Sequence, residues 1–491
     1  MLAIGVVMYR RTTDLSDFVL GGRTLGPAVA ALSAGASDMS GWLMLGLPGA
    51  IYFAGISESW LAIGLATGAY LNWQFIARRL RVYTEVSNNS ITIPDFLENR
   101  FKDTSRLLRL ISAIVILLFF TFYTSSGMVA GAKLFEASFG LSYQLALWIG
   151  VVVVVSYTFL GGFLAVVWTD FIQGTLMLLA LIVVPIVALT QIGGWNEAVQ
   201  AVGNINPGHL NMIKGVSTIA IISSIAWGLG YFGQPHIIVR FMALKSPKDV
   251  PTARFIGTTW MILGLYGAIF TGFVGLAFIA SQDVSVLESV GLAVVNDGGV
   301  QMLEDPEKIL IAFTQILFHP VVAGLLLAAI LSAIMSTIDS QLLVSSSAVA
   351  EDFYKAIFRR NATDQELVWV GRIATVAIAL IAAVIAINPE SSVLELVSYA
   401  WAGFGAAFGP VIVLSLFWKK TTRNGALAGI IVGAVTVIIW GDFLSGGIFD
   451  LYEILPGFLL GLIVIIVVSL MGKPDPQMEK EFDETIDRLH E

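Results

Sequence analysis

About twelve long stretches of mainly apolar residues run through the chain, and they restrict its fold more than any other feature. Each can cross the hydrocarbon core of a bilayer, which needs about 20 apolar residues in a helix. Lipid offers no hydrogen-bond partners, so a spanning backbone has to satisfy its own polar groups as a helix. We therefore predict an all-α polytopic membrane protein with about 12–13 transmembrane helices. The stretches lie near 27–53, 58–77, 110–132, 143–160, 164–190, 216–239, 255–280, 320–348, 367–387, 393–417, 425–444 and 453–472.

The composition agrees with this expectation and excludes several classes of function. Charged residues make up 13% of the chain, about half of the fraction in soluble domains. Because there is no cysteine, disulfides, thiolate metal sites and cysteine nucleophiles are excluded. The sequence also has no G-x-x-x-x-G-K-[ST] and no H-E-x-x-H motif, so a nucleotide-driven pump and a metalloprotease have no support. A secondary transporter or a channel remains; we expect neither enzyme activity nor nucleic-acid binding.

The basic residues predict how the chain is oriented. With alternating spans, 24 of the 27 Lys and Arg residues fall on one side, which the positive-inside rule assigns to the cytoplasm. The exceptions are Lys133, Lys214 and Lys308. This places the acidic C-terminal tail in the cytoplasm, where we expect it to be solvated. The apolar run Met1–Tyr9 is too short to span, and we interpret it as part of a truncated flanking helix.

The span 27–53 is interrupted at its centre by SAGASDMSGW, Ser33 to Trp42. Glycines favour an unwound backbone there, and the carbonyls that unwinding frees become available as ligands. Asp38 lies near the middle of the bilayer, where a carboxylate costs about 2.5–3.5 kcal/mol unless it has a partner or a wet cavity. Close packing of small residues explains the glycines, but it does not explain the charge.

The span 216–239 carries a second break, AWGLGYFGQPH, Ala226 to His236. Three glycines and Pro235 within eight residues oppose a regular helix, because Pro removes a donor and Gly weakens each turn. Trp227 and Tyr231 are four residues apart and can share one face. Aromatic side chains beside unwound backbone suit a small, partly apolar ligand, although a proline-kinked helix with buried aromatics is the alternative.

The two breaks occupy matching positions, since each opens a run of five predicted spans. Interrupted helices at corresponding places in two halves indicate an inverted-repeat transporter with its site at the midplane. Five crossings is an odd number, so the second copy has to be inverted. We predict these segments: 1–26, a truncated flanking helix and cytoplasmic loop; 27–190, the first repeat; 191–215, an outer loop; 216–417, the second repeat; 418–472, two flanking helices; 473–491, a cytoplasmic acidic tail.

The span 320–348 carries hydroxyl groups that suit a hard cation such as Na⁺, which prefers several oxygen ligands. Ser336, Thr337 and Ser340 can present hydroxyls on a shared helical face, with Asp339 beside them. Each hydroxyl can instead bond its own helix backbone. Asp170 is a second buried acid, although it can equally be a helix cap or an interface residue.

Several long strings resemble the sodium:solute symporter family, in its sodium/proline branch. They are ALSAGASDMSGWLMLGLPGA (31–50), GISESW, YTFLGGFLAVVWTD (157–170), GLGYFGQPHI, AILSAIMST and VSYAWAGFGAAFGP (397–410), and the resemblance runs from about residue 10 to 472. It implies a leucine-transporter-like core, an inverted five-helix repeat, with additional flanking helices.

The resemblance also implies roles for individual residues. A sodium site would use the carbonyls of Ala36, Met39 and Ala333 with the hydroxyls of Ser336 and Thr337. Asp38 would act in sodium coupling, and Ser40 in sodium and proline affinity. The residues expected around proline are Tyr123, Trp227, Tyr231 and Pro235.

Two further acids enter through the same resemblance. Asp170 matches an aspartate linked to sodium release toward the cytoplasm. Asp339 lies where some relatives carry a small hydroxyl residue. Asp170, Asp339, Ser336 and Ser340 together define a possible second, inner cation site.

The function expected from these features is Na⁺-coupled uptake of L-proline across the cell membrane by alternating access. Na⁺ is the coupling ion, the bilayer is the surrounding solvent, and no obligatory protein partner is evident. One alternative is another small amino or organic acid as the solute. Another is a sensor or channel on the same fold, although no ring of polar pore residues supports it.

Overall fold

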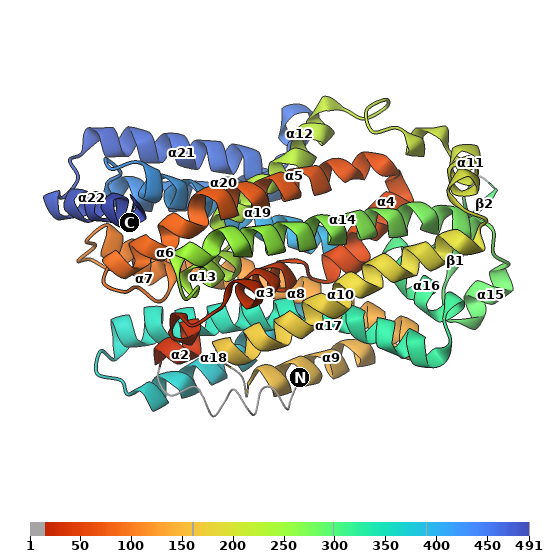
Figure 1. Cartoon of the computed structure of the whole chain (residues 1–491), viewed down its shortest axis with the longest axis horizontal. Coiled ribbons are helices and arrows are strands. Elements are labelled where there is room, and N and C mark those ends of the chain that lie inside the picture. Colours follow the sequence, from red (N-terminus) through yellow and green to blue (C-terminus); the bar gives the residue numbers. More distant parts are fainter. Residues whose placement is uncertain (1–14, 160–161, 298, 389, 491) are drawn as a thin grey trace.

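Long helices that run side by side along one axis form nearly all of this computed structural model (Figure 1). It describes residues 15–159, 162–297, 299–388 and 390–490. The helix that we expected to begin at Met1 therefore lies outside the described residues.

Every predicted span corresponds to one helix or to a pair of helices. Eight helical segments in the described part of the chain are long and apolar enough to cross a membrane. Apolar pieces of the other predicted spans are shorter, such as Trp42–Ala54, Tyr143–Ser156 and Thr218–Gly233. The expected all-α membrane architecture is confirmed.

The first half of the core begins after the short helix α2 (Leu15–Leu20). Its elements are α3 (Pro27–Asp38), η2 (Trp42–Gly46) and α4 (Leu47–Ala54); α5 (Ser59–Leu71), η4 (Asn72–Ile76) and α6 (Ala77–Val86); α7 (Ile93–Arg100); α8 (Leu107–Phe139); α9 (Tyr143–Thr158); and α10 (Phe163–Gln191).

The second half repeats the pattern of one broken helix followed by further long helices. Its elements are α12 (Thr218–Ala226), η6 (Trp227–Gly233) and α13 (Pro235–Met242); α14 (Val250–Ala280); α17 (Pro320–Ser347) and η9 (Ala348–Phe358); α18 (Asp364–Ile385); and α19 (Val393–Phe417). The flanking helices α20 (Arg423–Phe443) and α21 (Ile454–Met471) follow. The described helices thus follow the order of elements expected for an inverted five-helix-repeat core with flanking helices.

Smaller elements gather at the two ends of the bundle. At the right end in Figure 1 lie α11 (Trp195–Ile205), α15 (Val284–Ser289) and the antiparallel pair β1 (Val294–Asp297) and β2 (Val300–Leu303). The turn η8 (Pro306–Lys308) and α16 (Ile309–Leu317) connect this hairpin to α17. At the left end lie α7 and the C-terminal helix α22 (Pro476–His490).

The acidic tail is not a free solvated end, which corrects our expectation. It forms α22, whose Met478 and Phe482 are buried. The Phe482 ring packs edge-on against Tyr83, with 6.3 Å between the ring centroids. Acidic residues of α22 pair with the loops beside them, since Lys419 Nζ lies 2.6 Å from Asp483 Oδ2. One apolar stripe on this polar helix was enough to dock it against the bundle.

Asp103 organises the loop before α8 at the same end of the molecule. Its carboxylate accepts hydrogen bonds from the Ser105 hydroxyl at 2.6 Å and the Leu108 amide at 2.8 Å, and it pairs with Arg423 at 2.9 Å. Burial alone would raise the pKa of Asp103, but these hydrogen bonds and the Arg423 charge outweigh it and hold the pKa below its usual value.

Candidate functional site

The first break is narrower than the sequence suggested. Helix α3 continues to Asp38, and only Met39 to Gly41 separate it from the wide turn η2. The Ser40 amide bonds the carbonyl of Asp38 at 2.9 Å. It therefore does not bond the carbonyl of Ala36, the partner that a continuous α-helix would provide, so this carbonyl is freed.

The freed carbonyl meets the hydroxyl-bearing face of α17. Ser336 Oγ donates to the oxygen of Ala36 at 2.8 Å, and Thr337 Oγ1 lies 3.3 Å from the same oxygen. Both hydroxyls also reach the carbonyl of Ala333, at 3.0 and 3.3 Å. Four of the five expected sodium ligands thus form one contact, which joins α3 to α17. Met39, the fifth, follows directly after α3, and its amide bonds Gly35 at 2.8 Å.

Asp38 is buried and is surrounded by groups of both breaks. The Tyr231 hydroxyl donates to Asp38 Oδ2. The main-chain carbonyl of Asp38 accepts from Trp42 Nε1 at 3.0 Å and from the Tyr123 hydroxyl at 3.3 Å. Asp38 Oδ1 has no hydrogen-bond partner among the residues that the structure describes. One oxygen of this buried carboxylate therefore remains available.

Aromatic rings cover the second break. The Trp227 ring lies 6.5 Å from Trp42, 6.3 Å from Trp401 and 5.2 Å from Tyr452, measured between ring centroids. Tyr231 meets Trp401 edge-on at 5.0 Å. Trp401 Nε1 also donates to the carbonyl of Trp227 at 2.7 Å. Two expected proline-pocket residues, Trp227 and Tyr231, therefore share one aromatic group with Trp401 of α19.

Glycine at the second break is required by the close approach of α5. A Cβ atom on Gly68 would lie 2.1 Å from the carbonyl oxygen of Gly228, and one on Gly228 would lie 2.4 Å from the oxygen of Gly64. These contacts are with backbone, which cannot rotate away. The two segments can touch only because neither carries a side chain at this crossing.

The remaining expected pocket residues take separate positions. Ser40 is buried in the first break, and its Oγ accepts from the Trp42 amide at 3.3 Å. Tyr123 packs edge-on against His236, with centroids 5.7 Å apart. Pro235 lines a different small cavity with Val239. The structure thus brings Tyr123, Trp227 and Tyr231 toward the Asp38 region and places Pro235 on a separate cavity.

A buried ionic cluster that the sequence did not reveal joins α3, α10, α13 and α17. Arg240 in the last turn of α13 is fully buried and pairs with Asp170 Oδ2 at 3.4 Å. Its Nη2 also donates to Ser340 Oγ at 2.6 Å, and its Nε to Ser33 Oγ at 3.1 Å. Ser33 in turn donates to Asp170 at 2.7 Å. A guanidinium thus lies between two members of the expected inner cation site.

Asp339 lies apart from this ionic cluster. Its Oδ1 accepts from the Thr158 hydroxyl at 2.7 Å, so it faces α9. Its Oδ2 has no partner in the described ranges. Asp170 and Asp339, which we had grouped together, therefore have different partners in this structure.

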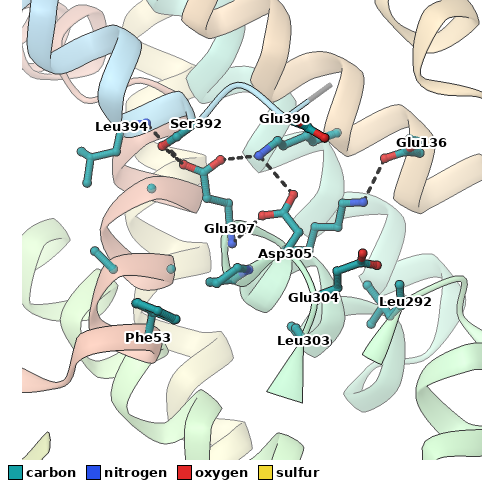
Figure 2. A pocket seen from close by; sticks show the side chains of 17 residues that line it. Phe53, Glu136, Leu292, Leu303, Glu304, Asp305, Glu307, Glu390, Ser392 and Leu394 are labelled. Carbon is teal, nitrogen blue, oxygen red and sulfur yellow. Dashed lines mark hydrogen bonds and ion pairs between the residues drawn. The ribbon is translucent and has the colours of Figure 1, made fainter. Parts of the chain in front are cut away.

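A charged cavity of about 590 Å³ lies beside β2 and η8 (Figure 2). Glu307 points at the start of α19 and accepts from the Val393 amide at 3.0 Å, which suits a helix N-terminus. Lys133, one of our three outer lysines, bonds Glu307 at 2.6 Å and Asp305 at 3.1 Å. This cluster ties α8, η8 and α19 together above the breaks.

Sequence reasoning missed Arg240, Trp401 and Asn72. Arg240 was counted as an ordinary inner-face cation, although it directly follows the apolar residues Ile237, Ile238 and Val239. Trp401 lies in a quoted string, VSYAWAGFG, but nothing in its spacing indicates a contact with Trp227. Asn72 is a polar residue within the predicted span 58–77, and that was a usable signal.

The broken helices, the freed carbonyl and the buried polar groups at the breaks define a membrane transporter with an inverted-repeat core. The sodium:solute symporter family model matches residues 18–433. The chain therefore belongs to the sodium:solute symporter family.

Curated relatives resemble the chain along its whole length. It is 52% identical over 491 residues to the sodium/proline symporter of Escherichia coli (strain K12), covering all of this chain and 95% of that protein. It is 53% identical over 491 residues to the high-affinity proline transporter PutP of Bacillus subtilis (strain 168), covering both chains fully.

A solved structure agrees with the fold. It is a substrate-bound outward-open state of a Na⁺-coupled sialic acid symporter, with a TM-score of 0.77 and 18% identity. The similarity covers 96% of each chain. It supports the shared architecture of the two chains.

Proposed function

We propose that this protein couples the inward movement of Na⁺ to the uptake of L-proline by alternating access. The observation that carries this proposal is the identity of about half of all residues, along the full chain, to relatives named as proline transporters. The contact between Ala36 and Ser336 fits the same function, because it groups oxygen atoms of the kind Na⁺ prefers at the junction of two helices.

Na⁺ binding would hold α3 against α17. The carbonyls of Ala36, Met39 and Ala333 with the hydroxyls of Ser336 and Thr337 supply enough oxygens for a desolvated cation. In the present arrangement the hydroxyls donate to the carbonyls. A bound cation would instead contact the hydroxyl oxygens and the carbonyl oxygens. The hydroxyl protons would therefore have to turn away from the positive ion.

Proline would bind beside this junction, against Tyr123, Trp227 and Tyr231, with Ser40 and Pro235 at its margins. Tyr231 also bonds Asp38, so the solute pocket and the cation region share one side chain. Each ligand then stabilises the arrangement that the other needs, and the coupling free energy is the same in both directions. One inward Na⁺ charge contributes roughly 2.3 kcal/mol per 100 mV of membrane potential.

Asp170, Asp339 and Ser340 would act on the inner path of the ion. Arg240 pairs with Asp170 and Ser340, so a cation that arrives there meets a positive charge and is repelled. This favours release over a second resident ion, with Asp339 as a separate acid that faces α9.

We further propose a cell-membrane location with the C-terminal tail in the cytoplasm. The supporting observation is that α22 lies at the same end as the basic loops. The segments 27–190 and 216–417 are proposed as the two repeats. A transporter of this kind needs no covalent chemistry, no nucleic acid and no obligatory protein partner.

The test is proline uptake by purified protein in proteoliposomes. An inward Na⁺ gradient should raise the initial rate well above the rate with equal Na⁺ on both sides. A panel of unlabelled amino and organic acids should compete less well than proline. Equal rates with and without the gradient would exclude the coupling, and stronger competition by another solute would exclude proline as the main substrate.

A further inference from the structure

The second break leaves a carbonyl that its own helix cannot satisfy. In an α-helix the carbonyl of Tyr231 would accept from the amide four residues later. That residue is Pro235, which has no N–H group, and the extended backbone of Gln234 (φ −78°, ψ 107°) ends the helical course before it. A buried carbonyl without a donor is strongly unfavourable, so another segment has to supply one.

The donor is Asn72, which opens the wide turn η4 between α5 and α6. Asn72 Nδ2 lies 2.9 Å from the Tyr231 oxygen, and the side chain is only 1% exposed. Because the partner is a carbonyl, the amide nitrogen has to face it. Wide turns of this kind occur frequently at functional sites.

The Asn72 bond continues into the first break through Tyr231. The main chain of Tyr231 is held by Asn72, and its hydroxyl donates to the carboxylate of Asp38. Asn72 and Asp38 also line the same cavity of about 20 Å³. The Oδ1 atoms of Asn72 and Asp38 have no partner within the described part of the chain. The two breaks, at Asp38 and at Tyr231, thus meet the wide turn of Asn72 at this point.

We propose that Asn72 is a positioning residue for cation coupling: by bonding the Tyr231 carbonyl that the second break leaves free, it sets where Tyr231 holds Asp38. This inference rests on the proposed Na⁺-coupled transport and adds a residue to that mechanism. Without the Asn72 donor the Tyr231 segment moves toward another donor. Asp38 then loses its fixed partner, although the break itself persists.

The first test replaces Asn72 with leucine, which has a similar volume and no hydrogen-bonding groups. In proteoliposomes, Asn72→Leu should raise the Na⁺ concentration for half-maximal proline uptake about tenfold. At saturating Na⁺ and proline the maximal rate per folded transporter should stay above roughly half of the wild-type rate, because no ligand atom has been removed. A purely structural residue would instead lower the maximal rate and the melting temperature at unchanged Na⁺ dependence.

Thr258→Val is the matched control. Thr258 lines the same cavity, but its hydroxyl bonds its own helix, 2.7 Å from the Arg254 carbonyl. The proposal predicts an unchanged Na⁺ dependence for this variant. A shift as large as that of Asn72→Leu would assign the effect to the cavity and overturn the role of the hydrogen bond.

A double-mutant cycle with Tyr231→Phe tests the cause directly. Phenylalanine keeps the ring and removes only the hydroxyl that donates to Asp38. The effect of Asn72→Leu on Na⁺ dependence should then shrink to less than about threefold, because no bond to Asp38 remains to be positioned. An undiminished effect in the Tyr231→Phe background would contradict the proposal.

Uptake by the wild-type protein distinguishes a failure of this inference from a failure of the proposed function. If wild-type proteoliposomes show no Na⁺-driven proline uptake, the proposed function fails, and this inference fails with it. If they transport normally and Asn72→Leu leaves the Na⁺ dependence unchanged, only the positioning role fails.

Discussion

Removing the Ser336 hydroxyl is the most informative perturbation of the expected sodium site. Ser336 is fully buried, and its Oγ lies 2.8 Å from the freed carbonyl of Ala36 and 3.0 Å from that of Ala333. Ser336→Ala removes one expected ligand oxygen and leaves the helix intact, since alanine is the best helix former. Thr337 remains as the second hydroxyl at the junction.

The size of the effect follows from the buried contact. A hydrogen bond to a charged group contributes about 1.5–3 kcal/mol, and we take the ligand-to-ion contact as comparable. With about 1.4 kcal/mol for each factor of ten, Na⁺ affinity should fall roughly 10- to 100-fold. The added Thr337→Ala change should weaken it further, because the Ala36 carbonyl then loses both side-chain partners.

The assay is the Na⁺ dependence of initial proline uptake in proteoliposomes, measured at constant ionic strength. Ser346→Ala on the same helix is the control, because its buried hydroxyl bonds its own helix backbone, 3.0 Å from the Leu343 carbonyl. That variant should behave as wild type. A half-activating Na⁺ concentration within about twofold of wild type for Ser336→Ala would refute the assignment of Ser336 as a ligand.

Three further predictions concern packing, charge and pH. Gly68→Ala should abolish most proline uptake, because the new Cβ would lie 2.1 Å from the carbonyl of Gly228, and crowding of this kind costs about 1–3 kcal/mol. Arg240→Ala should destabilise the protein by about 3–5 kcal/mol in thermal melts, since Asp170 stays buried without its partner. The pKa of Asp103 is lowered on folding, so the ionised carboxylate stabilises the fold fully above about pH 4, and this stabilisation is lost as the pH falls through the lower folded pKa. The melting temperatures of wild type and Asp103→Asn should therefore differ at pH 7 and converge below about pH 4.

Each of these predictions has a control. Gly324→Ala adds the same methyl group in open space and should leave proline uptake normal. Equally normal uptake by Gly68→Ala would contradict the close-approach argument. Asp170→Asn should relieve much of the loss in Arg240→Ala. A pH-independent difference between wild type and Asp103→Asn would show that the Asp103 charge does not contribute.

The positions of the apolar helices and of both breaks could be predicted, because they depend on local sequence. A run of apolar residues has to become a helix in lipid. A cluster of glycines with Pro235 opposes a helix wherever it occurs. The first break was predicted too wide, since Ser33 to Asp38 remain helical. Small residues permit unwinding, but they do not require it.

The partners of individual polar groups could not be predicted without coordinates. Asp38 was identified from its charge, yet its bond to Tyr231 joins residues 193 positions apart. Arg240 looked like a loop cation until the fold placed it between Asp170 and Ser340. The docking of α22 depends on a complementary surface on α6. The sequence of the tail alone carries no information about that surface.

Reciprocal coupling provides the most direct test of the account. Proteoliposomes held at zero membrane potential, with equal Na⁺ on both sides, should take up ²²Na⁺ faster when proline is supplied outside, because each ligand moves only with the other. The account predicts a proline-dependent rise in ²²Na⁺ uptake that vanishes in empty liposomes. The same ²²Na⁺ uptake with and without proline would contradict symport, whatever the binding data show.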